Sequence, residues 1–210
     1  NLAFLPEFAL SAAILSIDLD AIGESTYDLP TLDDEDRAGV VDAGDPFGGN
    51  DGKNQARLVA DGPVRVYSPG VRNAYDLVIT DSGRMYTIDN GPNTVWGGLP
   101  TGEGTAGCTN EIVEAGNFLW DNLHHVTGPG YYGGHANPTR ANAANTFNAS
   151  NPQSPVADDN PIECDYRPPG AADGALWAFS HSTNGIVEYR AGNFDGELQG
   201  DILAASFDNK

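Results

Sequence analysis

Apolar and polar residues alternate most clearly in the stretch GVRNAYDLVITDSGRMYTIDNGPN, which covers residues 70–93. The alternation runs across residues 76–80 and again across residues 84–88, with the segment DSG between the two runs. A period of two is typical of strands with one buried face, and a short segment that contains Gly commonly closes a hairpin. The pattern therefore predicts an antiparallel β-hairpin over residues 76–88.

Polar clusters stand at both ends of this predicted hairpin. Arg72 and Asn73 precede it, and the run DNGPN follows it at residues 89–93. Such residues weaken a buried strand unless each polar group finds a hydrogen-bond partner. Two interpretations of these clusters are weighed, and the residues alone favour the first. Either DNGPN is a turn and Arg72 makes a surface ion pair, or the two ends form a binding site.

Further strands are predicted in the remainder of the chain. One is expected within residues 1–20, and three short ones are expected near the C-terminus, over residues 176–179, 185–189 and 201–206. The best helix candidate is TNEIVEAGNFLWDNLHHV, residues 109–126, and Gly116 interrupts it. Short strands without a long helix predict an all-β fold.

Two long polar segments separate the predicted strands. Residues 21–61 contain few residues suited to a core and are predicted to form a surface insertion. Residues 93–172 are rich in Gly, Asn, Pro and Thr and are predicted to form a long loop-rich insertion. Both segments decorate the strands rather than form a second core.

Histidines and aromatic residues in the second segment each have two interpretations. His124 and His125 could bind a metal, but adjacent residues of a strand point to opposite faces, so we interpret them as ordinary loop residues. The aromatic residues either stack on sugar rings or pin a Gly-rich loop onto the sheet. They are Trp96, Trp120, Tyr131 and Tyr132.

The charge balance is strongly acidic, with 10 Lys and Arg against 30 Asp and Glu and a net charge of −20. Such a surface repels phosphate backbones and anionic lipid, so no nucleic-acid binding is expected. No apolar run approaches the length of about 20 residues that a membrane helix needs, so no membrane span is expected. Most of the acidic residues are interpreted as aids to solubility and a few as cation-binding groups.

The chain has two cysteines. Cys108 stands in a Gly-rich stretch and Cys164 in a Pro-rich one. Two interpretations are open: a disulfide that closes this long loop, or two unrelated free thiols. The glycosylation-type triplet at Asn148 and the loop-rich chain favour the disulfide and an exported, oxidising setting. A zinc site is disfavoured, because neither cysteine has a partner at metal-binding spacing.

A weak internal repeat relates two segments of the chain. DLVITDSGRMYTIDN and ELQGDILAASFDN both end a strand in Asp-Asn after a strand and turn. Consecutive blades of a β-propeller leave such repeats, because each blade is a four-stranded sheet that stacks on its neighbours.

Three segments together resemble a known family. VRNAYDLVITDSGRMYTIDNGPN, YYGG and STNGIVEYRAGNFDGELQGDILAASFD are similar to the soluble glucose/sorbosone dehydrogenases, which are quinone-dependent aldose dehydrogenases. The likeness is closest to versions of this domain embedded in large exported bacterial proteins. It implies that residues 1–210 are a fragment of one six-bladed β-propeller, about two to three blades, with long loop insertions.

The resemblance also implies roles for the two polar clusters. Arg72 and Asn73 would contact the carboxylates of pyrroloquinoline quinone, since a guanidinium can donate two parallel hydrogen bonds. Gly91 and Pro92 would offer main-chain carbonyls to the calcium ion (Ca²⁺) that holds the quinone, since this cation prefers oxygen ligands. The remaining blades of the propeller or other subunits would be partners, with sugars as candidate ligands, in a secreted, periplasmic or cell-surface protein.

The catalytic base that the resemblance implies is a histidine upstream of the hairpin, and no histidine precedes His124. This chain therefore does not contain the base, and two functions stay open. One is a fragment of an exported, quinone- and calcium-dependent sugar dehydrogenase-like propeller. The other is a non-catalytic extracellular propeller module with a binding or structural role in a cell-surface assembly.

Overall fold

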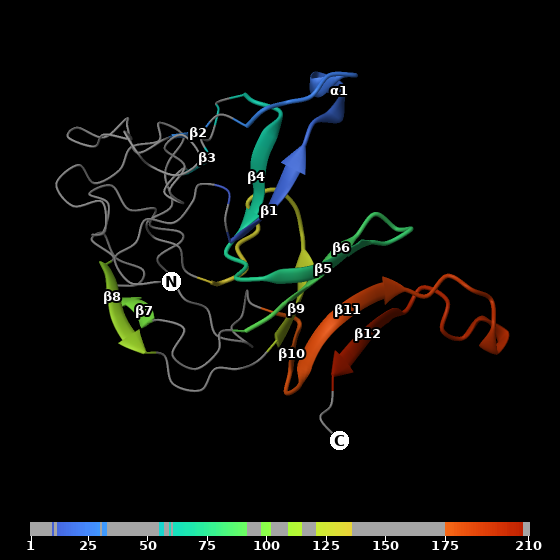
Figure 1. The fold of residues 1–210 in the computed structure, drawn as a ribbon. Coiled ribbons are helices and arrows are strands. Elements are labelled where there is room, and N and C mark those ends of the chain that lie inside the picture. The colour runs from blue at the N-terminus through green and yellow to red at the C-terminus, as the bar shows by residue number, and fades with distance from the viewer. Residues whose placement is uncertain are drawn as a thin grey trace, which may run out of the picture.

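The parts of the chain that the computed structural model describes are residues 10, 12–29, 59, 61–91, 121–135 and 175–207, with the backbone alone of four further short strands. Their regular structure is almost entirely antiparallel strand (Figure 1). The exceptions are a helix of 4 residues, α1 (Leu19–Ile22), and a 3-10 turn of 3 residues, η2 (Phe194–Gly196). The predicted all-β fold class is confirmed. No helix in this described part is long and apolar enough to cross a membrane.

A four-stranded antiparallel sheet forms the centre of the described structure (Figure 1). Its strands lie side by side in chain order. They are β5 (Ala74–Ile79), β6 (Met85–Asp89), β9 (Asp121–Val126) and β10 (Trp177–Phe179). The connections therefore pass from each strand to its direct neighbour.

The β5–β6 hairpin forms as the alternation predicts. Asp76 lies opposite Ile88, and Ile79 lies opposite Met85. Gly83 in the turn has φ 76°, a left-handed conformation that glycine adopts at little cost. The hairpin prediction is confirmed.

The segment that was the best helix candidate forms two strands instead. Its first part is β8 (Thr109–Glu114), paired with β7 (Gly98–Thr101), and its second part is β9 of the central sheet. The buried positions of β9 include polar residues, Asp121 and His124, so the apolar alternation that marks a strand is missing. The expectation that the chain has no long helix therefore holds for this segment, and the two strands in it were not predicted.

Two further strand pairs lie beside the central sheet. β1 (Ala13–Ile17) pairs with β4 (Val64–Pro69), and β11 (Ser182–Glu188) pairs with β12 (Ile202–Phe207). The predicted N-terminal strand is confirmed by β1, and the three predicted C-terminal strands are confirmed by β10, β11 and β12. A small pair, β2 (Thr31–Leu32) with β3 (Gln55–Ala56), lies within the segment predicted as the first insertion.

The two larger pairs are linked to opposite faces of the central sheet, since successive residues of a strand point to opposite sides. β11 packs directly on β5 and β6, whereas β4 is linked to the sheet through the loop that follows β9. On one face, Asp121 of β9 accepts a hydrogen bond from the main-chain amide of Thr183 in β11 (2.7 Å). On the other face, His124 bonds the hydroxyl of Tyr131. The carbonyl of Tyr131 accepts a hydrogen bond from Ser68 of β4 (2.7 Å).

Close packing holds the loop after β9 against β4. The amide of Gly133 donates to the carbonyl of Pro69 (2.9 Å), which extends the hydrogen bonding of the β4 strand. Gly70 has φ 82°, and a Cβ atom there would lie 2.4 Å from the ring of Tyr132. Tyr132 is therefore one of the residues that pin this Gly-rich loop onto the sheet, as one of the two interpretations expected.

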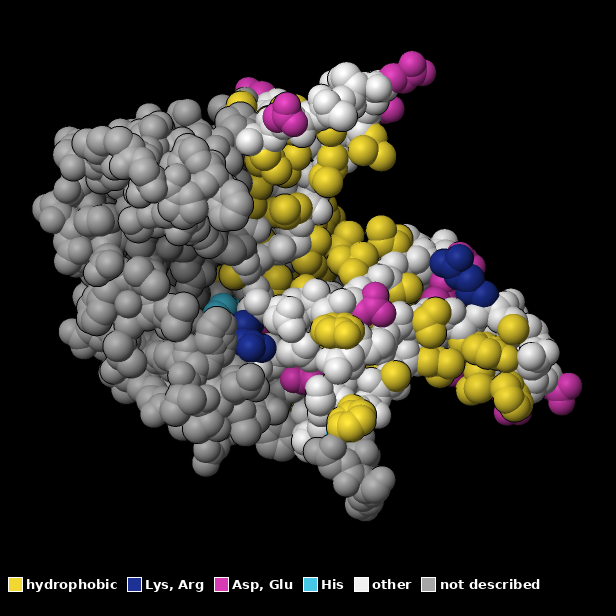
Figure 2. Space-filling model, in the orientation of Figure 1, with side chains coloured by type: hydrophobic (Ala, Val, Ile, Leu, Met, Phe, Trp, Pro, Cys, Tyr) yellow, Lys and Arg dark blue, Asp and Glu magenta, His cyan; other side chains and the backbone are white. Residues whose placement is uncertain are grey.

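Apolar side chains are only partly covered in the described structure. Ile88 and Ile186 are buried between β6 and β11, but several strand residues remain exposed. Figure 2 shows hydrophobic side chains along both walls of the hollow between the β1–β4 pair and the β5–β6 hairpin. Ile17, which is 55 % exposed, stands on β1, and Ile79, also 55 % exposed, stands on β5.

Candidate functional site

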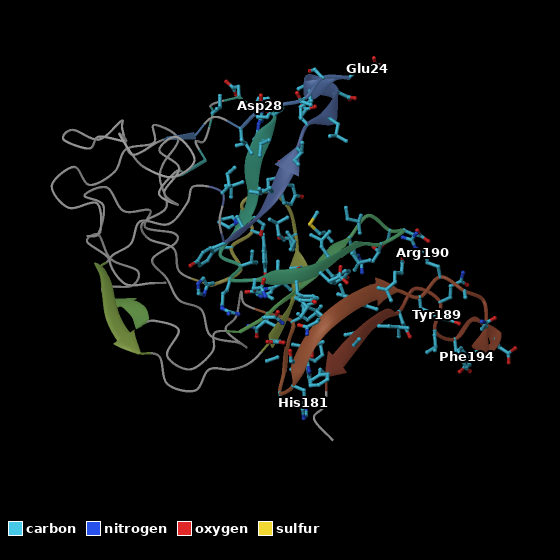
Figure 3. All side chains as sticks on the ribbon, in the orientation of Figure 1. Glu24, Asp28, His181, Tyr189, Arg190 and Phe194 are labelled. Carbon is cyan, nitrogen blue, oxygen red and sulfur yellow. The ribbon has the colours of Figure 1, made fainter. Side chains whose placement is uncertain are left out.

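A cluster of polar residues lies where β6 ends and β9 and β11 begin, and we call it the junction cluster. It joins the predicted site residues to side chains from distant parts of the chain. Its members are Arg72, Asn73, Asp89, Asn90, Gly91, Asp121, Thr183 and Asn184. In Figure 3 it belongs to the end of β11 near His181, whereas Tyr189, Arg190 and Phe194 mark the other end.

Asp89 fixes the chain where it enters β5. Its two carboxylate oxygens accept the main-chain amides of Arg72 (3.0 Å) and Asn73 (2.6 Å). Asp89 is only 4 % exposed. This burial raises the pKa of Asp89 to about 6, although the two amides and the charge of Arg72 act in the opposite direction.

The side chain of Arg72 turns toward the end of β6. Its Nη1 donates to the carbonyl oxygens of Asn90 (3.0 Å) and Gly91 (2.8 Å). Arg72 is half-buried, so these bonds are partly shielded from water. The guanidinium thus ties the two ends of the hairpin together.

Asn90 connects four segments through its side chain. Its Nδ2 lies 2.8 Å from Oδ2 of Asp121 and 2.9 Å from Oδ1 of Asn184, with the carbonyl of Thr183 at 3.3 Å. Its Oδ1 accepts a hydrogen bond from Nδ2 of Asn73 (2.9 Å). This single amide side chain therefore links the start of β5 to β9 and β11.

Asp121 is the second buried carboxylate of the cluster, with 7 % of its surface exposed. Its Oδ2 accepts the amide of Thr183 (2.7 Å) as well as the Asn90 side chain. Its Oδ1 accepts the amide of Gly91 (2.9 Å). Three N–H groups from two segments thus converge on one carboxylate, which is a stable arrangement for a buried negative charge.

The structure brings together three of the four predicted site residues. Arg72, Asn73 and Gly91 belong to one hydrogen-bonded cluster, while Pro92 lies outside the described residues. Gly91 offers its carbonyl to Arg72, so the group expected to bind calcium meets the group expected to bind the quinone. Within the described residues no group of three or more His, Cys, Asp or Glu side chains forms a metal-binding set.

Other predicted features fall outside the described residues. They are the two cysteines expected to form a disulfide and two of the aromatic residues, namely Cys108, Cys164, Trp96 and Trp120.

Sequence reasoning missed the partners that complete the cluster. Asp121 lies within the segment predicted as a helix candidate, which hid its place at the start of a central strand. Thr183 and Asn184 stand in the motif STNG, which supported the family resemblance but gave them no role. Asp121 reaches the end of β6 through the pairing of β9 with β6, in which Asn122 lies opposite Asp89.

The histidines of β9 serve the packing of the sheet. Burial lowers the pKa of His124 to about 4, and its Nδ1 lies 2.9 Å from the hydroxyl of Tyr131. His125 points to the opposite face and stacks on Tyr86, with ring centroids 4.9 Å apart. The expected opposite orientation is confirmed, but the interpretation of the pair as loop residues was wrong, since both stand in a strand. Burial also lowers the pKa of His135, to about 3.

A second set of carboxylates, outside the junction cluster, also fastens β11 to the β5–β6 hairpin. Oδ2 of Asp76 accepts the amide of Ile186 (3.1 Å), and Oε2 of Glu188 accepts the amide of Asp81 (2.9 Å). Arg190 bridges Glu188 and Asp81 at 2.9 Å each. The amide of Asp81 and the guanidinium of Arg190 lower the pKa of Glu188. Carboxylates therefore fasten β11 along its whole length.

Comparison with known proteins gives no relative for this chain. No protein-family model, no curated protein and no solved structure matches it. Any functional argument therefore depends on the geometry of the junction cluster and on the resemblance of the motifs.

Proposed function

We propose that the chain is part of a β-propeller of the glucose/sorbosone dehydrogenase type, in a quinone- and calcium-dependent sugar dehydrogenase. The order β5–β6–β9–β10 supports this, because a four-stranded antiparallel sheet with strands in chain order is the unit of a propeller blade. The β1–β4 and β11–β12 pairs on its two faces would belong to the neighbouring blades. The chain would then supply one complete blade and parts of two others.

Uncovered apolar residues support the need for further blades or subunits. On β11 and β12, Val187 and Leu203 are cross-strand partners, and they are 55 % and 41 % exposed. Phe207 at the end of β12 is 65 % exposed. In a complete propeller these side chains would pack against the next blade, which removes apolar surface from water.

The observation that carries the functional proposal is the contact between Nη1 of Arg72 and the carbonyl of Gly91 at 2.8 Å. According to the resemblance, Arg72 would bind the quinone carboxylates and the carbonyl of Gly91 would bind the calcium ion. The donor set suits this chemistry, because main-chain oxygens are hard ligands and a guanidinium matches a carboxylate. Two carboxyl groups, Asp89 and Asp121, stand against one guanidinium, so a cation is electrostatically acceptable in the cluster.

Ligand binding at this site requires an exchange of partners. A calcium ion on the carbonyl of Gly91 would repel the guanidinium of Arg72, which must then turn to an anionic partner. The quinone carboxylates are such a partner. When bound, the quinone accepts the hydride of the sugar, while the residues of this chain hold and orient it.

The test uses the full-length protein that carries this chain. Addition of calcium should raise its melting temperature, because a ligand of the folded state stabilises that state. Pyrroloquinoline quinone should then bind only when calcium is present, and dye reduction with glucose or other aldoses should follow. Absence of a calcium effect on both melting and quinone binding would refute the proposal.

A second function, a non-catalytic propeller module in a cell-surface assembly, is favoured by one specific observation. Both carboxylates of the junction cluster are satisfied from within the cluster: Asp89 accepts two N–H groups, and Asp121 accepts three. Arg72 ties two carbonyls at the same time. Carboxylates that are satisfied in this way are what a purely structural clasp needs. Unchanged melting with calcium, in a well-folded protein that reduces no dye, would support this function.

A further inference from the structure

We propose that Asp121 is a positioning residue, which couples the docking of the β11–β12 pair to the arrangement of Arg72 and Gly91. Asp121 would set the direction of the main-chain carbonyls at the end of β6 only while β11 is in place. The proposal deepens the proposed function and rests on it for the ligand, but the coupling itself is a property of the described residues alone.

The peptide unit between Asn90 and Gly91 shows how the coupling works. Its N–H donates to Oδ1 of Asp121 (2.9 Å), and its carbonyl accepts from Nη1 of Arg72 (3.0 Å). A peptide unit is planar and rotates as one body. The hydrogen bond to Asp121 therefore fixes the orientation of the carbonyl that faces Arg72, and it constrains the carbonyl of Gly91 that follows.

The other carboxylate oxygen of Asp121 is hydrogen-bonded to β11. Oδ2 accepts the amide of Thr183 at 2.7 Å, and Thr183 is fully buried, with 0 % of its surface exposed. Loss of the β11 contact would leave the side-chain amide of Asn90 as the remaining donor to this oxygen among the described residues, so the carboxylate would be held less firmly. Because the Asp121 side chain is buried, both contacts are at least partly shielded from water, and each is stronger than an exposed hydrogen bond.

Asn90 provides a parallel connection between the same elements. Its side-chain amide contacts Oδ2 of Asp121 and Oδ1 of Asn184, which directly follows Thr183 in β11. Displacement of β11 thus disturbs Asp121 and the side chain of Asn90 together. Coupling of binding free energies is reciprocal, so a ligand at Gly91 should also tighten the docking of β11.

Asp76 offers a matched control for Asp121. It also accepts an amide of β11, that of Ile186 (3.1 Å), and its other oxygen accepts the amide of Leu77 (2.9 Å). Neither of these bonds involves the Asn90–Gly91 peptide. Asp76→Asn and Asp121→Asn therefore remove the same charge and weaken the same strand, but only Asp121→Asn acts on the peptide unit.

The experiment measures amide hydrogen exchange in the full-length protein, without ligand and with calcium chloride. Both variants should speed exchange within residues 182–188. Only Asp121→Asn should also speed exchange of the Gly91 amide, by about tenfold or more, and weaken calcium binding by a similar factor. Calcium should slow exchange of the Thr183 amide in the wild type and in Asp76→Asn, but not in Asp121→Asn.

Equal effects of the two variants on the Gly91 amide would overturn the proposal, because Asp121 would then act only through general loosening. If the wild type binds no calcium, the proposed function fails, yet the exchange comparison without ligand still decides the coupling. If Asp121→Asn does not fold, Asn184→Ala replaces it, since this change removes one contact to Asn90 (2.9 Å) and an exposed one to Ser182 (3.3 Å) and leaves Asp121 itself unchanged. Faster exchange of the Gly91 amide in Asn184→Ala supports the coupling, and unchanged exchange refutes it.

Discussion

The two faces of the central sheet are held to their neighbours by different chemistry. The face toward β4 relies on close approach, since Gly70 leaves room for the ring of Tyr132, and on the neutral pair His124 and Tyr131. The face toward β11 relies on carboxylates that accept main-chain amides. These carboxylates are Asp76, Asp121 and Glu188.

This difference predicts which perturbation each face responds to. Steric contacts depend on side-chain volume and change little with pH, because burial keeps the pKa of His124 near 4. Carboxylate contacts depend on charge and on how deeply each pair is buried. Substitutions that change volume should therefore matter where β4 meets the loop after β9, and changes of charge or pH should matter at the buried carboxylates.

The largest effect is expected for Gly70→Ala on the β4 face. The new Cβ would lie 2.4 Å from the Tyr132 ring, and φ of 82° is unfavourable for alanine. Overpacking and backbone strain together should cost about 4 kcal/mol of unfolding free energy, measured by urea denaturation.

Gly83→Ala is the control for this substitution. Gly83 has a similar φ of 76°, but a Cβ there meets open space. Only the conformational cost of about 1 kcal/mol should remain. If both variants lose the same amount of stability, the close approach of β4 to the loop does not hold this face.

The next effect concerns the pH dependence of stability through Asp89. Its pKa is raised by burial from 3.8 to about 6, so the folded state binds a proton more tightly than the unfolded state. The stability that this proton provides is full below pH 3.8 and is lost as pH rises through about 6. At roughly 1.4 kcal/mol per pKa unit, the change amounts to at most about 3 kcal/mol. Urea denaturation across this range should show the decline in the wild type and its loss in Asp89→Asn.

Glu188, which stands in β11, provides the opposite slope. Its pKa is lowered by the amide of Asp81 and by Arg190, so its contribution is present above its ordinary value of 4.5. That contribution disappears as pH falls through the lowered pKa. The wild type should therefore lose unfolding free energy as pH falls into this range, and Glu188→Gln should not show this part of the loss. If Asp89→Asn and Glu188→Gln changed the pH dependence of the unfolding free energy in the same direction, the assignment of the two slopes would be contradicted.

Local sequence patterns predicted the β5–β6 hairpin and missed several other strands, among them β9 of the central sheet. The β5–β6 hairpin was predictable because apolar alternation and a Gly-containing turn act within a few residues. β9 was not, because its buried positions include Asp121 and His124, whose burial depends on partners elsewhere in the chain. Tertiary contacts decided this strand, and no local pattern records them.

The candidate site divides in the same way. Arg72, Asn73 and Gly91 could be named from the sequence, since they flank one hairpin and the motif resemblance gave them roles. Asp121 and Thr183 could not, because they approach this hairpin only through the pairing of β9 with β6 and the docking of β11. Such long-range contacts depend on the whole fold and have no signal within a short window.

A moderate effect is expected for Arg72→Ala in the junction cluster. The change removes the donor to the carbonyls of Asn90 and Gly91, and these half-buried groups are only partly compensated by water. The unfolding free energy should fall by about 1 to 2 kcal/mol. Arg65→Ala is the control, because exposed Arg65 donates to one carbonyl, that of Gly62. An equal loss in both variants would show that the Arg72 contacts contribute nothing beyond an exposed hydrogen bond.

The smallest effect is expected for Arg190→Ala at the far end of β11 (Figure 3). Its side chain is 55 % exposed and that of Asp81 is 69 % exposed, so water and salt screen their contact. Glu188 would keep the amide of Asp81 as a hydrogen-bond donor after the change. The melting temperature should not shift measurably at an ionic strength of about 0.15 M, and a small decrease should emerge at low salt. A loss as large as that of Arg72→Ala would mean that the exposed end of β11 holds the strand as firmly as the buried cluster does.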